Sequence, residues 1–212
     1  LAPARDLLAY RVAPGFEAPR VMRRLAESLS GQVRVRPMIR RDKAHELGIL
    51  RDIFNDAWSQ NYGFVPFTVE EFNDVGKLMT LLLPDDYVQI AEVDGEPAAF
   101  IVAMPNINEV TAGLRGRLLP LGWLRLLWGL KVRHPQSARV PLMGVRKKFQ
   151  QSRLGPGLAF MVIDAVRKGL CARGVREVEL SWILEDNSGM RSIIEAIGGQ
   201  VYKRYRIYEK AI

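Results

Sequence analysis

The feature of this sequence that most restricts its fold is that helix-like and strand-like patterns of apolar residues alternate along one chain. Apolar residues recur with helical spacing in some segments and form short or alternating strand-like runs in others. Helical spacing covers 17–29, 43–60, 69–82, 158–173 and 188–197, and strand-like runs cover 32–39, 87–93, 96–104, 139–145, 177–184 and 200–210. From residue 32 the order is β α α β β β α β α β, which predicts an α/β fold with a mixed sheet.

Local signals indicate where several of these elements begin and end. Asp42 stands where an N-cap of the helix over 43–60 belongs. Thr68 and Glu71 have the spacing of a capping box, which predicts the start of the helix over 69–82. Asp94-Gly95 separates two apolar runs, and this dipeptide is typical of a tight β-hairpin.

The length of 212 residues fits one large domain or two small ones. Because the chain begins with Leu1 rather than Met, we expect it to be part of a longer protein. Residues 1–30 are then predicted to be a leader, whose first twelve residues end a preceding module, and residues 31–212 to be the principal domain.

Several classes of protein and site are excluded by what the sequence lacks. The single cysteine, Cys171, excludes an intramolecular disulfide and a cysteine-rich zinc site. His45 and His134 have no neighbouring metal-ligand residues, so we expect no metal. No apolar run is long enough to span a membrane and no signal peptide is present, which predicts a cytoplasmic protein.

The positive charge is concentrated in one stretch of the chain. The net charge is +8, yet residues 110–163 contain no acidic residue and carry +10, which leaves −2 for the rest. The ten basic residues of this stretch are Arg115, Arg117, Arg125, Lys131, Arg133, Arg139, Arg146, Lys147, Lys148 and Arg153. Such a stretch is either a solvated face or a surface that meets phosphate or anionic lipid. A nucleic-acid partner is the weakest option, because no helix-turn-helix, zinc-finger or RNP-type motif is present.

A basic loop with two glycines follows the strand over 139–145. Gly155 and Gly157 stand at the start of the helix that follows this loop. Glycine allows a backbone to approach a phosphate closely, and a helix N-terminus offers free N–H donors. The same glycines also fit a tight strand-to-helix turn without a ligand, and this alternative is equally compatible with the sequence.

The glycine loop and the elements that follow it resemble the GNAT acyltransferase superfamily. In that family a Q/R-x-x-G-x-G/A loop binds the pyrophosphate of acyl-CoA, and here the loop reads Ser152-Arg-Leu-Gly155-Pro-Gly157. The family's later N-x-x-A-x-x-x-Y-x-x-x-G-F helix corresponds to Asn187, Met190, Ile194, Gly198 and Gly199. The segments 179–187 and 202–208 are similar to a proteobacterial branch that includes the bacterial ceramide synthases, whose chains carry an additional N-terminal half.

The resemblance implies a fold, a co-substrate and a binding site. The fold is a mixed, mostly antiparallel sheet flanked by helices, with a splayed central strand pair. The co-substrate is acyl-CoA or CoA, without a metal. The residues implied in binding it are Val145, Arg146, Lys147, Ser152, Arg153, Leu154, Gly155, Gly157 and Asn187.

The implied activity is transfer of an acyl group from an acyl thioester, either acyl-CoA or an acyl carrier protein, to an amine. The resemblance offers a lipidic or sphingoid-type amine as one option for the acceptor. The sequence departs from the family at four positions, and two of them, Pro156 and Ile194, support an alternative, a non-catalytic module that binds CoA or acyl carrier protein. Ser152 replaces Gln/Arg, Pro156 lacks an N–H, Ile194 stands where a Tyr is frequent, and Gly199 replaces Phe.

Amide formation from a thioester needs a proton acceptor for the amine and donors for the developing oxyanion. The resemblance assigns the oxyanion donor to the Val145 N–H. Glu179, within a strand, is our first candidate for the base because a carboxylate there needs a partner or a task. Glu185 is the second, although Glu185-Asp186 equally suits capping of the next helix.

Three tyrosines of the last strand, Tyr202, Tyr205 and Tyr208, are candidates for the general acid, with Tyr202 preferred. By the alternation of a strand, Tyr202 and Tyr208 share a face and Tyr205 takes the other. Packing is the alternative role for each of them.

A Leu- and Trp-rich segment over 118–130 lies between pairs of basic residues. It contains Pro120 and is too short to span a bilayer. Two tryptophans and flanking cations suit a membrane interface, so 114–133 is predicted to contact a membrane surface or to cover an acyl chain. A core helix is the alternative.

Overall fold

The computed structural model describes residues 1–114 and 116–210, and the side chain of Leu78 lies outside this description. The predicted role of Arg115 in the basic stretch therefore falls outside the described residues. The strands are β1 (Ala2–Val12), β2 (Val33–Pro37), β3 (Val88–Val93), β4 (Glu96–Pro105), β5 (Ser137–Val145), β6 (Glu177–Leu184) and β7 (Gln200–Glu209). The helices are α1 (Arg20–Leu29), α2 (Lys43–Trp58), α3 (Val69–Leu82), α4 (Ile107–Thr111), α5 (Gly122–Trp128), α6 (Lys147–Gln150), α7 (Leu154–Ala172) and α8 (Ser188–Ala196).

The strands of the described residues form one mixed sheet in the order β2-β3-β4-β5-β6-β1-β7. β1 pairs antiparallel with both β6 and β7, and β3 pairs antiparallel with β2 and β4. β5 and β6 are parallel, with a register that runs from Ser137↔Glu177 to Val140↔Leu180. The predicted mixed, mostly antiparallel sheet flanked by helices is confirmed. The predicted splay would lie beyond this register and stays a prediction.

The chain divides into two compact units. Unit 1 contains 1–18, 104–141 and 170–212, and unit 2 contains 19–103 and 142–169. Residues 1–30, the predicted leader, form β1 and α1, and each of these elements belongs to a unit that also contains later residues.

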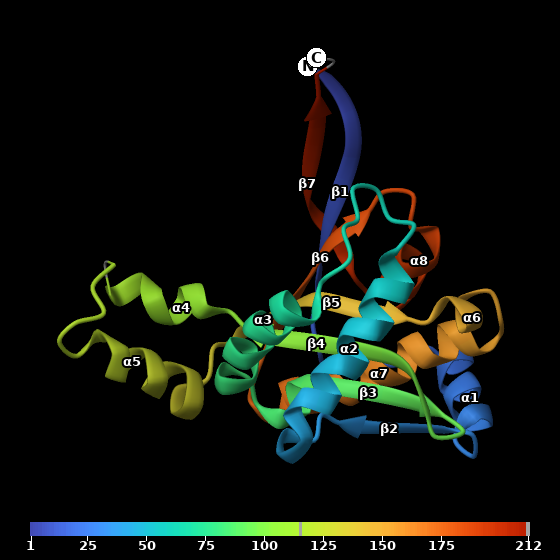
Figure 1. Ribbon diagram of the computed structural model, residues 1–212, viewed down its shortest axis with the longest axis horizontal. Helices are drawn as coiled ribbons and strands as arrows, with labels where there is room; N and C mark the ends of the chain where they lie inside the picture. The colour runs from blue at the N-terminus through green and yellow to red at the C-terminus, as the bar shows by residue number, and fades with distance from the viewer. Residues whose placement is uncertain (115, 211–212) are drawn as a thin grey trace. The chain divides into compact units, whose positions relative to one another are not determined.

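Unit 2 packs helices on both sides of its strands. Figure 1 shows α2 in front of β3 and β4, and α7 behind them. Ile53 on α2 and Phe100 on β4 are buried in this core, with 0% of their surface exposed. Gly144 on β5 allows the close approach, because a Cβ there would lie 3.0 Å from Phe100 Cε1 and 3.2 Å from Ala57 Cβ.

A buried ion cluster ties β2 to α2 and β3 in unit 2. Arg36 donates from both terminal nitrogens to the Glu46 carboxylate, at 2.8 and 3.0 Å, and from Nε to Glu92 at 2.7 Å. Glu46 also accepts from the Ile39 N–H at 3.1 Å. Because Glu46 is almost fully buried, removing its arginine partner would leave an uncompensated charge in the core.

Of the predicted cap and turn signals, two are confirmed and one is confirmed only in position. Thr68 and Glu71 form the expected capping box at the start of α3. Asp94 and Gly95 have φ of 50° and 85°, which makes the predicted tight hairpin between β3 and β4. Asp42 does occupy the N-cap of α2, but its side chain makes no capping hydrogen bond.

In unit 1, β1 is a central strand between β6 and β7. Tyr10 on β1 is fully buried, and its hydroxyl donates to Glu195 and accepts from Arg191, both at 3.1 Å. These two residues lie on α8, so a single buried hydroxyl fastens that helix to the strand.

An insert between β4 and β5 forms a helical hairpin of α4 and α5, which Figure 1 shows in yellow-green. A π-helical turn, Gly129–Arg133, extends α5. Glu109 closes the base, accepting from the N–H groups of Gln136 and Ser137 at 2.9 Å.

The core-helix alternative for the Leu- and Trp-rich segment is wrong. Leu119, Leu121 and Trp128 expose 80%, 66% and 63% of their surface. Among the described residues, no helix is both long enough and apolar enough to cross a bilayer.

Candidate functional site

Glu179 lies at the centre of a polar cluster on one face of the unit 1 strands. Its carboxylate accepts hydrogen bonds from Ser181 Oγ at 2.5 Å and from the Tyr202 hydroxyl. Ser181 follows on the same strand, β6, whereas Tyr202 reaches Glu179 from β7, on the far side of β1. The structure therefore brings together two predicted catalytic residues, Glu179 and Tyr202.

A cation completes the cluster. Arg139 on β5 lies opposite Glu179 in the parallel register, and its Nε lies 3.4 Å from Glu179 Oε1. The Arg139 Nε is buried and makes no hydrogen bond among the described residues. The guanidinium also lies 4.7 Å from the centre of the Trp182 ring, within cation–π range. Arg139 is thus oriented by a carboxylate and an aromatic ring together.

The cluster sets the protonation states of Glu179 and Tyr202 in opposite directions. Burial raises the pKa of Glu179, but hydrogen bonds from Ser181 and Tyr202 and the charge of Arg139 outweigh it, so the pKa is below its usual value. Burial and then the hydrogen bond to Glu179 raise the pKa of Tyr202. At neutral pH Glu179 is therefore ionised and Tyr202 keeps its proton.

The Tyr202 ring is held in place by cations. The Arg11 guanidinium lies 4.0 Å from the ring centre and Lys203 Nζ lies 5.0 Å from it. Tyr205 instead packs against Trp182, with ring centres 6.0 Å apart, and Tyr208 is 54% exposed. Of the three tyrosine candidates, Tyr202 is the one that contacts Glu179.

Sequence reasoning missed Arg139 and Arg11 as members of this cluster. Arg139 is counted in the basic stretch, but its pairing with Glu179 depends on the parallel β5–β6 register, and the strand-like runs do not specify register. Arg11 lies opposite Glu179 in the β1–β6 register, within a segment predicted to be a leader. Neither position carries a local signal of its own.

Glu185 and Asn187 both make structural hydrogen bonds in unit 1. The Glu185 carboxylate accepts from the Asp6 N–H at 3.1 Å, and its backbone N–H donates to the Asp6 carbonyl at the same distance. Asn187 caps α8, accepting from the Met190 N–H at 3.1 Å. The alternative that Glu185 and Asp186 cap the next helix is therefore wrong, because Asn187 is the residue whose side chain caps α8. The catalytic role of Glu185 and the CoA-binding role of Asn187 stay predictions.

Packing explains two of the family departures. Ile194 is 1% exposed in the core of unit 1. A Cβ on Gly199 would lie 2.4 Å from Ile194 Cγ2 and 2.8 Å from the Ile194 carbonyl oxygen. The chain therefore turns directly against Ile194 after α8, and only glycine fits at position 199.

In unit 2, the amides of the predicted phosphate-binding loop are bonded within the loop itself. Ser152 N–H donates to the Phe149 carbonyl at 3.0 Å, and Gly155 N–H donates to the Ser152 carbonyl at 3.2 Å. The Ser152 hydroxyl donates to the Phe149 carbonyl and accepts from the Leu154 N–H at 3.1 Å. Ser152, where the family has Gln or Arg, therefore caps the start of α7.

Both glycines of the loop have a packing reason. A Cβ on Gly155 would lie 2.7 Å from the Phe149 carbonyl oxygen and 2.9 Å from that of Gln150. A Cβ on Gly157 would lie 2.4 Å from Leu29 Cδ1, on α1. Packing in a tight turn therefore accounts for both glycines.

The charge of the loop fits an anionic group. Lys147 and the exposed Arg153 flank the start of α7, whose N-terminus adds positive potential. Arg146 and Lys148 are directed to the β3–β4 hairpin, where Arg146 Nε donates to the Pro97 carbonyl and Lys148 pairs with Glu96. Lys147 and Arg153 therefore stay the predicted cations for a pyrophosphate.

Val145, the predicted oxyanion donor, is buried at the end of β5. Its carbonyl accepts from Gln150 Nε2 at 2.7 Å, and the next residue, Arg146, donates its N–H to the Ala98 carbonyl at 2.8 Å. On α2, Asp56 accepts from the Lys147 N–H at 2.7 Å, and Trp58 donates to the Met143 carbonyl at 2.9 Å. The backbone around Val145 is thus fixed from both sides.

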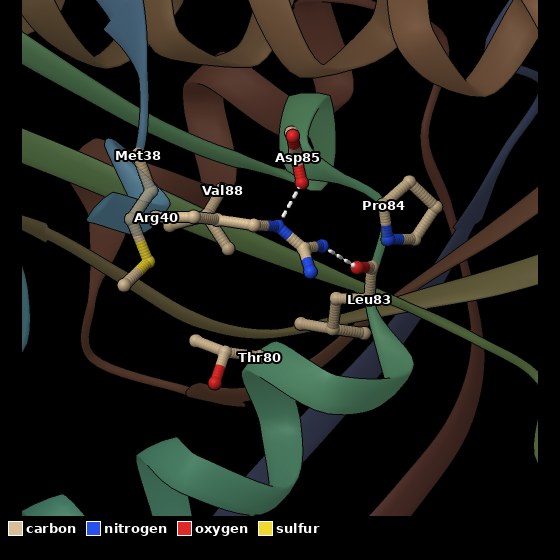
Figure 2. Close-up of a pocket in the computed structure, with 7 residues that line it drawn as sticks. All are labelled: Met38, Arg40, Thr80, Leu83, Pro84, Asp85 and Val88. Carbon is tan, nitrogen blue, oxygen red and sulfur yellow. Dashed lines mark hydrogen bonds and ion pairs between the residues drawn. The ribbon is translucent and has the colours of Figure 1, made fainter. Parts of the chain in front are cut away.

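Figure 2 shows a small pocket in unit 2 that contains none of the predicted site residues. The Arg40 side chain crosses it and bonds to the Leu83 carbonyl and to Asp85. In the described part of the chain, no three His, Cys, Asp or Glu side chains are grouped to hold a metal ion. Cys171 is exposed.

Comparison with known proteins gives relatives and a fold. Protein YghO of Escherichia coli is 49% identical over 90% of this chain and 49% of its own length. A Caulobacter vibrioides protein named bacterial ceramide synthase is 42% identical over 100% of this chain and 55% of its own. The chain thus spans about half the length of these curated relatives. No protein-family model matches it.

Among solved structures, a GCN5-related N-acetyltransferase from Sphaerobacter thermophilus aligns with a TM-score of 0.59 at 15% identity. The alignment covers 96% of this chain and 50% of that one. The fold is therefore that of the GNAT N-acetyltransferases. By sequence, the chain is similar to the two relatives above, one of which is named bacterial ceramide synthase.

Proposed function

We propose that this chain carries out acyl transfer from an acyl thioester to an amine, as part of an N-acyltransferase. The observation that carries the proposal is the Glu179 cluster, a half-buried ionised carboxylate held by Ser181, Tyr202 and Arg139. Such a group, with a pKa shifted by burial and by specific partners, is typical of a functional site. The GNAT fold of the chain supports the same reaction class.

When bound, an acyl thioester supplies the activated acyl group, and Lys147 and Arg153 would hold its phosphates. The residues of the chain have different tasks. Glu179 is ionised and accepts hydrogen bonds, so it can orient a protonated amine or accept its proton. Tyr202 donates a hydrogen bond to Glu179 and so positions that carboxylate. The backbone N–H of Val145 is our candidate donor to the developing oxyanion.

The lowered pKa of Glu179 limits what it can do. A carboxylate whose pKa lies below its usual value is a weaker base than an ordinary glutamate. It therefore serves best by orienting the neutral amine and accepting its proton as the nitrogen attacks the acyl carbon. The C–S bond then breaks, and the thiolate takes up a proton and leaves as thiol.

The acceptor we propose is a long-chain amine of the sphingoid type. This choice comes from the name of the Caulobacter relative, bacterial ceramide synthase, which aligns over 100% of this chain. The donor is acyl-CoA or an acyl carrier protein thioester. The basic loop is compatible with both, because both donors present a phosphate group.

Kinetics of substituted chains test the proposal. We expect Glu179→Gln to lower kcat by about 100-fold or more, because an amide cannot orient a charged amine or accept its proton. Tyr202→Phe keeps the ring beside Arg11 and should lower kcat less. Because the Tyr202 hydrogen bond helps to lower the pKa of Glu179, its loss should also move the acid limb of the pH profile to higher pH.

The matched control is Glu70→Gln, which removes the same charge from an exposed position of α3. Thiol release should continue at the wild-type rate in this variant. A Glu179→Gln chain that turns over as fast as wild type would contradict the role of Glu179. A chain that binds CoA but makes no amide with any donor or amine would favour the non-catalytic alternative.

A further inference from the structure

The helical insert between β4 and β5 exposes many large apolar side chains that lie close together in the sequence. We call the Leu/Trp surface the set of six exposed side chains Leu119, Leu121, Trp123, Leu124, Leu127 and Trp128. Each exposes between 40% and 80% of its surface. Isolated exposed apolar residues are ordinary, but a contiguous apolar patch of this kind marks an interaction site.

The hairpin that carries this surface is firmly built. Gly129 allows α4 to pack closely, because a Cβ there would lie 2.3 Å from Val110 Cγ1. Leu130, on the inner side, is 2% exposed. At the base, Asn106 N–H donates to the Ser137 carbonyl at 2.9 Å, beside the Glu109 clamp. The outward direction of the Leu/Trp surface therefore follows from packing within the insert.

The charge around the surface identifies its partner. Arg117, Lys131 and Arg133 are exposed and lie beside the apolar residues. From residue 110 to residue 163 the sequence contains no acidic residue, and Glu109 is bonded to the base of the hairpin. An anionic bilayer surface complements both the apolar side chains and the cations. A second copy of this chain does not, because two such surfaces would bring like charges together.

We propose that the Leu/Trp surface docks the chain onto the interface of an anionic lipid bilayer. Trp123 and Trp128 enter the headgroup region with the neighbouring leucines, while the basic side chains meet lipid phosphates. The inference deepens the proposed function by placing the chain where a long-chain amine resides. Vesicle binding is measured without turnover, so its failure and that of the proposed function are distinguishable.

Vesicle co-sedimentation of the 212-residue chain tests the inference. We expect binding to vesicles of phosphatidylglycerol and phosphatidylethanolamine, and weaker binding to phosphatidylcholine alone. Leu121→Ser with Trp128→Ser should lower the partition coefficient by about tenfold or more, because both side chains bury apolar area in the interface. Arg117→Gln and Arg133→Gln should each lower it by about fivefold on anionic vesicles and have little effect on phosphatidylcholine.

The control is Val21→Ser on α1, which removes an apolar side chain that is 78% exposed outside the insert. Its vesicle binding should equal that of wild type. Thermal unfolding of each variant should match wild type, because exposed positions are changed, so loss of binding cannot be assigned to misfolding.

Three results would overturn the inference. One is wild-type binding by the Leu121→Ser/Trp128→Ser chain. The second is failure of the wild-type chain to bind anionic vesicles at low salt. The third is a dimer, detected by sedimentation, that the same double substitution dissociates, because the surface would then be covered by a second copy.

Discussion

Asp6 is a buried carboxylate, 5% exposed, that two arginines of β7 surround. Arg206 donates to it at 2.7 and 2.9 Å, and Arg204 donates at 2.9 Å. The hydrogen bond from Arg206 is the largest influence, and although burial opposes it, the pKa of Asp6 falls from 3.8 to about 2. The ionised form is therefore favoured by folding, and β1 is fastened to β7 through it.

Acid titration tests this linkage. A carboxylate whose pKa is lower in the folded chain stabilises it fully above the unfolded value of 3.8, and this contribution is lost as pH falls to about 2. We expect Asp6→Asn to have a lower Tm than wild type at pH 7. The difference should shrink between about pH 4 and pH 2. A difference in Tm that stays constant to pH 2 would contradict the ion-pair account.

Single residues also show why part of the site could not be read from the sequence. Glu179 stands out because it is a carboxylate inside an apolar strand, and this signal is local. The partners that fix its chemistry, Arg139 and Tyr202, come from two other strands, and Arg11, which lies over the Tyr202 ring, comes from a third. Asp6 and Arg206 are likewise far apart in sequence. Such pairs depend on strand order and register, which hydrophobic periodicity does not specify.

At the scale of elements, the loop from β5 to α7 has two explanations for its glycines. Gly155 lies against the backbone of α6, where the carbonyl oxygens of Phe149 and Gln150 leave no room for a Cβ. Gly157 lies against the end of the Leu29 side chain, which can rotate away. The two positions should therefore respond differently to alanine.

Substitution by alanine separates packing from phosphate binding. Gly155→Ala should destabilise the chain by about 1–3 kcal/mol, because backbone atoms would have to move. Gly157→Ala should be close to neutral, because strain at Leu29 is offset by the better helix propensity of alanine, about 1 kcal/mol. Urea unfolding measures both effects. Equal destabilisation by the two substitutions would contradict this packing analysis.

The CoA affinity of the same variants tests whether Gly157 also takes part in phosphate binding. If Gly157 serves only packing, Gly157→Ala should bind CoA as wild type does. If it also allows a phosphate to approach the backbone, the variant should remain stable and lose affinity. Isothermal titration with CoA distinguishes these results, and Val21→Ser on α1 is a suitable control.

Most elements were predictable because their signals are local. The capping box at Thr68 and the Asp94-Gly95 turn form between residues close in sequence, and both are present. α6 escaped prediction because four residues are too few to show a helical period. The sequence did not decide whether the Leu- and Trp-rich segment is buried or exposed. Its helix has apolar residues on most sides, and its burial depends on what packs against it.

At the scale of the whole molecule, β1 illustrates what sequence reasoning alone could not place. Residues 1–12 read as the end of another module, yet β1 lies between β6 and β7, with Leu7 opposite both Leu184 and Tyr205. Contacts between the two ends of a chain leave no local pattern. The chain also spans about half the length of its curated relatives, so its activity must be measured on these 212 residues themselves.

The most direct test of the central proposal is mass spectrometry of the reaction product. The 212-residue chain would be incubated with a long-chain amine and an acyl thioester labelled with ¹³C in the acyl carbonyl, as either acyl-CoA or acyl carrier protein. The proposal predicts an amide that carries the label, formed with release of one thiol per amide and strongly reduced with Glu179→Gln. Labelled free acid without amide, or amide formed equally by the Glu179→Gln chain, would contradict it.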